Sequence, residues 1–93
     1  VVMKQVIFSV YDLKACIYDR PFSAVNKDSA KRAFLDAAQN PEVTMSKHPE
    51  DYNLFALGEF NDGTGELKPY KNIEYIASAN DAPKEKVTEI TPV

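Results

Sequence analysis

Residues 26–39, NKDSAKRAFLDAAQ, predict the one long helix on which the rest of the fold depends. Asn26 is a good N-cap, because its side-chain oxygen can accept a hydrogen bond from a free amide of the first turn. Apolar residues recur at intervals of three and four residues and form one stripe, namely Ala30, Ala33, Phe34, Ala37 and Ala38. Asn40-Pro41 supplies the stop signal. A lone helix of this length is only marginally stable in water, so we expect it to pack closely on a sheet through its alanines.

Two extended segments precede this helix. Residues 5–11 are rich in β-branched and aromatic side chains with a period of two, and residues 15–18 resume that pattern after a short connection. Together they predict a β-hairpin, which ends at Arg20-Pro21 because proline has no amide hydrogen for the ladder. Cys16 falls in the middle of the second strand, where we expect a buried structural thiol.

The segments after the helix complete the predicted sheet. Residues 43–47 alternate and predict a short edge strand, and residues 48–51 predict a turn. Residues 52–60 predict a second long strand, whose alternate residues share one face. The glycines of residues 61–65, NDGTG, predict a tight turn.

Beyond that turn, residues 66–68 predict a hairpin partner that stops at Pro69, and residues 70–77 fit either a last strand or a short helix. From residue 78 onward the chain is polar and holds two prolines. We therefore predict one α+β domain over residues 1–77, a small antiparallel sheet of four to five strands with one helix packed across one face. A flexible polar tail is expected over residues 78–93.

The charge of the chain is unevenly distributed. Eleven basic and fourteen acidic residues give a net charge of −3, which is the wrong sign for a generic binder of polyanions. Residues 1–48, however, hold seven basic and five acidic residues, whereas residues 49–93 hold four basic and nine acidic ones. Such asymmetry indicates either a basic working face or an ordinary solvated surface.

The first half of the chain also interleaves aromatic residues with its cations. The candidate phosphate contacts are Lys14, Arg20, Lys27, Lys31 and Lys47, and the candidate stacking residues are Tyr11 and Tyr18, which sit at strand ends. Stacking platforms beside cations are what single-stranded nucleic acid requires. Core packing of the tyrosines and solvated lysines on a wet helix face remain the alternative interpretation.

The sequence offers little for catalysis or metal binding. His48 and Cys16 are the only histidine and cysteine, and no nucleophile, phosphate-cradle or metalloprotease motif occurs. In the segment His48-Pro49-Glu50-Asp51 an imidazole lies beside two carboxylates, but an ion would need further ligands from elsewhere. We expect no enzyme activity, no metal and no cofactor. No apolar run approaches the ~18–20 residues of a membrane span, so we expect no membrane contact.

Several segments, read in order, resemble a known family. They are residues 9–15 (SVYDLKA), 20–26 (RPFSAVN), 30–34 (AKRAF), 48–52 (HPEDY) and 58–65 (GEFNDGTG). In this order they resemble the small nonstructural DNA-binding protein of gokushoviruses, which are single-stranded-DNA phages of the Microviridae. The similarity runs from about residue 3 to residue 67 and supplies no mapped functional residues. It implies a phage protein of the host bacterial cytoplasm, outside the virion, that assists genome replication or the switch to making and packaging progeny DNA.

Two functions follow as expectations. The first is a non-enzymatic DNA-binding protein that favours single strands, holds phosphates without reading bases, and forms a homodimer that doubles its basic strip. The second is a protein-interaction adaptor that modulates a viral or host replication protein without contacting DNA. Net negative charge and an unpaired edge strand at residues 43–47 favour the adaptor.

Overall fold

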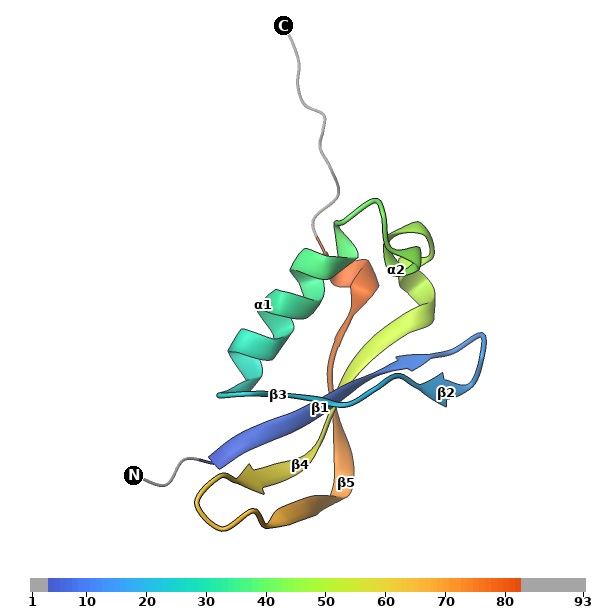
Figure 1. The fold of residues 1–93 in the computed structure, drawn as a ribbon. Helices are drawn as coiled ribbons and strands as arrows, with labels where there is room; N and C mark the ends of the chain where they lie inside the picture. Colours follow the sequence, from blue (N-terminus) through green and yellow to red (C-terminus); the bar gives the residue numbers. More distant parts are fainter. Residues whose placement is uncertain (1–3, 83–93) are drawn as a thin grey trace, which may run out of the picture.

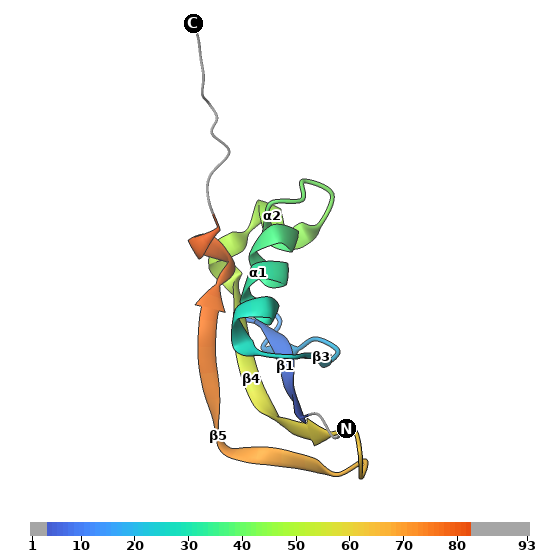
Figure 2. The ribbon, with the colours of Figure 1, turned by 90° about the vertical axis from the view of Figure 1, so that its left-hand side faces the viewer.

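One antiparallel sheet and one long helix make up the computed structural model, which describes residues 4–82. The sheet has five strands in the order β2-β1-β4-β5, with β3 also paired to β1. The predicted α+β class is therefore confirmed, and Figures 1 and 2 show α1 lying along one face of the sheet. The elements are β1 (Lys4–Asp12), β2 (Ile17–Tyr18), β3 (Phe22–Ala24), α1 (Lys27–Ala38), α2 (Thr44–Lys47), the 3-10 turn η1 (Pro49–Asp51), β4 (Tyr52–Asn61), β5 (Leu67–Ser78) and the 3-10 turn η2 (Ala79–Asp81).

The helix α1 begins at the predicted cap, but fewer of its alanines contact the sheet than the sequence predicts. The Asn26 side chain accepts a hydrogen bond from the Ser29 amide at 2.8 Å, which confirms the cap. The buried positions are Ala30, Phe34 and Ala38, at intervals of four residues. Ala33 and Ala37, which were expected in the same stripe, are exposed. Leu35 is half-buried and packs against the same core, so the contact stripe lies on the side of the helix away from Ala33 and Ala37.

The hydrophobic core lies between α1 and the face of the sheet that α1 covers. Phe8 on β1 faces Ala56 on β4, and Leu54 on β4 faces Ala77 on β5. All four side chains are fully buried. Alanine on both the strands and the helix lets the two layers approach closely, and the phenylalanine and leucine fill the remaining space.

Strands β2 and β3 lie along the same edge of β1. The hairpin prediction is confirmed by the pairs Tyr11–Tyr18 and Asp12–Ile17, although β2 has only two residues. The strand β3, in which Phe22 pairs with Phe8, was not predicted. The prediction of a buried Cys16 is wrong, since this residue is exposed in the turn and has a φ of 59°. The turn forms because the Asp12 carboxylate accepts the Lys14 amide at 2.9 Å, which removes Cys16 from the ladder.

The last strand is longer than predicted. The turn at residues 61–65 is confirmed, but β5 does not stop at Pro69, and residues 70–77 are all strand. Because β5 is an edge strand, Pro69 needs no amide to donate to a further neighbour. Gly58 lies opposite Pro69, and a Cβ atom at position 58 would meet the Lys68 carbonyl oxygen at 2.5 Å. The approach of the two backbones therefore requires glycine.

Two further predictions are corrected at the end of the domain where α2 lies. Residues 43–47 do not form an edge strand, because Thr44–Lys47 is the short helix α2, from which Met45 packs on the core. Residues 78–82 do not belong to a tail, because Ser78 and Asp81 close a capping box around η2, and Ala79 is buried. The rest of the predicted tail, residues 83–93, lies outside the described residues. In residues 4–82, no helix has the length and apolar character needed to cross a bilayer.

Candidate nucleic-acid interface

The face of the sheet opposite α1 can be traced from strand pairing. Leu54 belongs to the covered face, so its neighbour Phe55 belongs to the other, which is called the open face here. Phe55 pairs with Ser9 on β1 and with Tyr75 on β5, and paired residues share a face. Tyr11, two residues beyond Ser9, lies on the same face, as does its partner Tyr18.

Four aromatic rings contact one another across this open face. The ring centroids of Tyr11 and Tyr18 are 4.6 Å apart, those of Tyr18 and Phe55 6.1 Å, and those of Phe55 and Tyr75 5.8 Å. We call these four residues the aromatic row, which crosses β2, β1, β4 and β5. Tyr18 is 42% and Tyr75 is 54% exposed, whereas Tyr11 and Phe55 are half-buried. Exposed rings supported by neighbouring rings form a surface on which bases can stack.

The phenol of Tyr11 is held in its neutral form. Desolvation raises the pKa of Tyr11, and a side-chain hydrogen bond with Cys16 raises it further. A phenolate at this position would repel a phosphate backbone. The Tyr11 phenol itself therefore adds no negative charge, although the Asp12 carboxylate lies near this end of the aromatic row.

A buried hydroxyl fixes the position of Tyr18. Ser9 is 1% exposed, and its Oγ donates a hydrogen bond to the Asp19 carbonyl oxygen at 2.6 Å. The Asp19 amide donates to the Val10 carbonyl oxygen at 2.8 Å. These two bonds tie the link between β2 and β3 to β1, and they hold Tyr18 next to Phe55. Arg20 is the next residue of this link and is exposed.

The structure divides the predicted phosphate contacts between two layers. Lys27 and Lys31 lie on α1 and Lys47 ends α2, so these three belong to the helical layer on the covered face. Lys14 lies in the turn between β1 and β2, and Arg20 lies in the link between β2 and β3. The predicted cations therefore do not share one surface, whereas the two predicted tyrosines are in direct ring contact.

Lys27 already has a partner within the chain. Its Nζ lies 2.7 Å from a Glu74 carboxylate oxygen, and this bond is the chief cause of the raised pKa of Lys27. Glu74 pairs with Ala56 and so lies on the covered face. Lys27 and Lys31 are like charges four residues apart on α1, and the Glu74 carboxylate of β5 offsets the charge of Lys27.

The sequence analysis missed Phe55 and Tyr75 as members of the interface. The alternation of residues 52–60 places Phe55 on the face opposite Leu54, so this pattern could have identified it. Tyr75 was hidden because residues 70–77 fitted a helix as well as a strand. Lys71, four residues before Tyr75 on β5, is a further exposed cation of the same strand.

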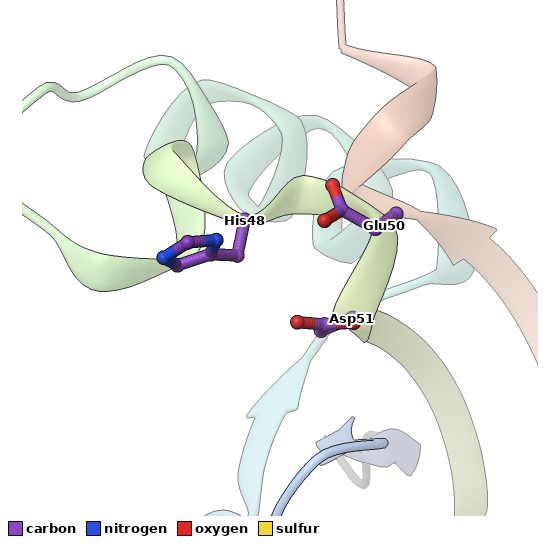
Figure 3. Close-up of side chains that lie close together, drawn as sticks. All are labelled: His48, Glu50 and Asp51. Carbon is purple, nitrogen blue, oxygen red and sulfur yellow. The ribbon is translucent and has the colours of Figure 1, made fainter.

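A second cluster lies in the turn before β4, where His48, Glu50 and Asp51 approach one another (Figure 3). Their candidate ligand atoms all lie within 4.8 Å of one another. The cluster offers three donor atoms, one fewer than the four that close a structural zinc site. Two of its side chains are exposed and the third is half-buried. Such an arrangement is also typical of a solvated polar turn.

Comparison with known proteins identifies a family. The sequence model of the family described as Phage ORF5 protein matches residues 5–82, which include every strand and helix described above except Lys4, the first residue of β1. No curated protein and no solved structure matches the chain.

Proposed function

The chain belongs to the Phage ORF5 protein family, and from this premise we propose that it is a non-enzymatic protein that binds single-stranded DNA on the open face of its sheet. The aromatic row is the observation that carries the proposal. Unpaired bases can lie flat on exposed rings, and each stacked base contributes about 1–3 kcal/mol. In a duplex the same base faces are already stacked on their neighbours, so the row favours single strands.

The phosphates are held by cations at the borders of the row. Arg20, two residues after Tyr18, and Lys14, in the turn whose Cys16 is hydrogen-bonded to Tyr11, are the cations proposed for this role. Lys27, Lys31 and Lys47 contribute only long-range attraction, because they lie in the helical layer. Two phosphate contacts on single-stranded DNA give a slope of log affinity against log salt of about −1.4. Stacking therefore supplies most of the affinity, as a chain of net charge −3 requires.

The biological setting is part of the proposal. The resemblance to the gokushovirus protein of the Microviridae suggests a role in replication of the phage genome or in the switch to progeny DNA synthesis and packaging. That role places the protein in the host bacterial cytoplasm and outside the virion. A homodimer would double the number of rings available to one strand, and a viral or host replication protein would be its partner.

A titration of labelled oligonucleotides tests this function. Fluorescence anisotropy is measured with an oligothymidine and with a duplex of equal length, across a series of salt concentrations. We expect binding of the single strand, weaker binding of the duplex, and a shallow salt slope near −1.4. Tight binding of both DNA forms with a slope steeper than about −4 would instead indicate phosphate recognition by many cations.

The adaptor function predicts the opposite result. It loses one of its supports, because residues 43–47 form α2 and leave no unpaired edge strand there. Partners recovered from infected cells are compared with and without nuclease treatment. An adaptor that never touches DNA keeps its partners after nuclease and fails to bind either oligonucleotide, and that pair of results would replace the DNA-binding proposal.

A further inference from the structure

An apolar cleft lies beside the helical layer and reaches the aromatic row at one point, because Tyr18 is among its lining residues. It has a volume of about 550 Å³, and its lining residues come from the β1–β2 hairpin, the C-terminal end of α1, the start of β4, and α2 with the residue before it. Figure 1 locates these elements. Its apolar walls include Val10, Ile17, Ala37, Val43 and Met45. The cleft shares Tyr18 with the surface proposed to bind DNA, and its other lining residues lie outside the aromatic row. The two proposals can still fail separately, because one is tested with peptides and the other with oligonucleotides.

The walls of this cleft are apolar side chains that the described fold leaves uncovered. Ile17 is 61% exposed. Ala37 belongs to the apolar stripe of α1 but is exposed, and Met45 is only half-buried. The small side chain of Ala37 leaves space beside the helix, and the flexible thioether of Met45 can adapt to what fills it. An aliphatic group placed here would be removed from water on several sides.

Carboxylates line the same cleft. Asp12 and Asp19 are among its lining residues, and no lysine or arginine of the described chain is. Asp12 is held in place, because its carboxylate accepts hydrogen bonds from the Lys14 amide and from the Tyr52 hydroxyl. The Asp19 carboxylate accepts the Arg20 amide at 2.8 Å. Two fixed negative charges beside an apolar wall disfavour a nucleic acid and favour a ligand that is both apolar and cationic.

We propose that this cleft binds a short peptide segment of another protein, in which a branched aliphatic anchor is followed by lysine or arginine. The anchor fills the space beside Ala37 and Met45, and the cation meets the carboxylate of Asp19. Charge complementarity selects this occupant, since an acidic segment would face Asp12 and Asp19 directly. Because Tyr18 borders both the cleft and the aromatic row, a bound peptide and bound DNA would meet at this residue.

Defined peptides test the cleft in the full chain. The probe is a fluorescein-labelled octapeptide with blocked ends, in which two leucines are followed by two lysines. One matched peptide carries glutamates in place of the lysines, and another carries serines in place of the leucines. We expect the leucine–lysine peptide to bind at least about tenfold more tightly than either matched peptide, because each of these lacks one of the two contacts.

Matched variants locate the binding. Ala37→Gln fills the cleft with a good helix former at an exposed site and should weaken the leucine–lysine peptide by about tenfold. Ala33→Gln, one turn earlier on α1 and outside the cleft, should leave affinity unchanged. Asp19→Asn should weaken the peptide by about threefold, whereas Asp36→Asn, on the exposed side of α1, should not.

Three results would overturn the proposal. The first is no binding of the leucine–lysine peptide up to about 1 mM. The second is equal affinity of the Ala37→Gln and Ala33→Gln variants. The third is a dimer in sedimentation equilibrium that Ala37→Gln dissociates, because a second copy of this chain, offering its exposed Leu13-Lys14, would then be the occupant.

Discussion

The two faces of the sheet are built from the same strands but from different classes of side chain. On the covered face, Phe8, Leu54, Ala56 and Ala77 are fully buried against α1 or against one another. On the open face, alternate residues of those strands form the aromatic row, where Tyr75 is 54% exposed. Most stability therefore comes from the covered face, and the open face keeps a large apolar area in contact with water.

This difference is informative because exposed rings are costly to leave without a partner. Soluble monomers rarely expose a contiguous apolar patch unless it binds something. A buried hydrogen bond also fixes the shape of the open face, because the Ser9 hydroxyl donates to the segment that carries Tyr18. A surface that is fixed in shape and left uncovered is typical of a binding site.

The largest effect, on the free energy of unfolding, is expected from a substitution on the covered face. Leu54→Ala removes a side chain that is 0% exposed and should lower the free energy of unfolding by about 2–5 kcal/mol. Chemical denaturation followed by circular dichroism measures the change. The matched substitution Leu67→Ala, at a residue 64% exposed on β5, should cost less than about 0.5 kcal/mol. Equal losses for the two variants would mean that the core is misplaced.

A smaller effect, on DNA binding and not on stability, is expected from a substitution on the open face. Tyr75→Ala should weaken binding of an oligothymidine by about 1–3 kcal/mol, because one stacking ring is lost, while the fold is retained. Leu67→Ala on the same strand serves as the control and should bind as the unaltered chain does. If both variants bind equally well in an anisotropy titration, the aromatic row is not the DNA surface.

The smallest expected effect is a loss of stability at alkaline pH, to which Tyr52 and Tyr11 both contribute. The pKa of Tyr52, which packs on the core, is raised by desolvation and by Asp12, and that of Tyr11 on the open face is also raised above its ordinary value of 10.0. A tyrosine with a raised folded-state pKa stabilises the fold below the unfolded-state pKa, and this contribution is lost as pH rises through the folded-state value. The urea midpoint should therefore fall between about pH 9 and pH 11.

Tyr52→Phe removes one of the groups responsible for that fall. The variant should lose less stability than the unaltered chain over the same alkaline range. Below pH 9 its urea midpoint should not vary with pH more than that of the unaltered chain. An equally steep alkaline fall in the variant would remove Tyr52 from this account.

The fold could be predicted where the periodic spacing of apolar residues ran over many positions and agreed with the neighbouring cap and turn residues. The helix around Ala30 and Phe34 has a cap and several repeats of its period, and both extended segments of residues 5–11 and 52–60 alternate over many residues. Residues 43–47 are too few to distinguish a period of two from one helical turn, and packing of Met45 on the core decided the outcome. Pro69 was read as a stop because its place on an edge strand depends on the whole sheet.

The candidate site was less accessible to sequence reasoning for a related reason. Charge clusters along a chain do not show which face of a fold each side chain will join, so Lys27 was grouped with Arg20 although it pairs with Glu74. Tyr11 and Tyr18 were identified from their places at strand ends. The row that they complete needed the register between β4 and β5, which brings Tyr75 opposite Phe55.

The most direct test of the central claim is an amide chemical-shift titration of the full chain with an octathymidine. Stacking on the aromatic row predicts that the largest shifts lie at and beside Tyr11, Tyr18, Phe55 and Tyr75, with little change along Lys27–Ala38. The opposite pattern, with shifts gathered on α1 and none on the open face, would contradict the account.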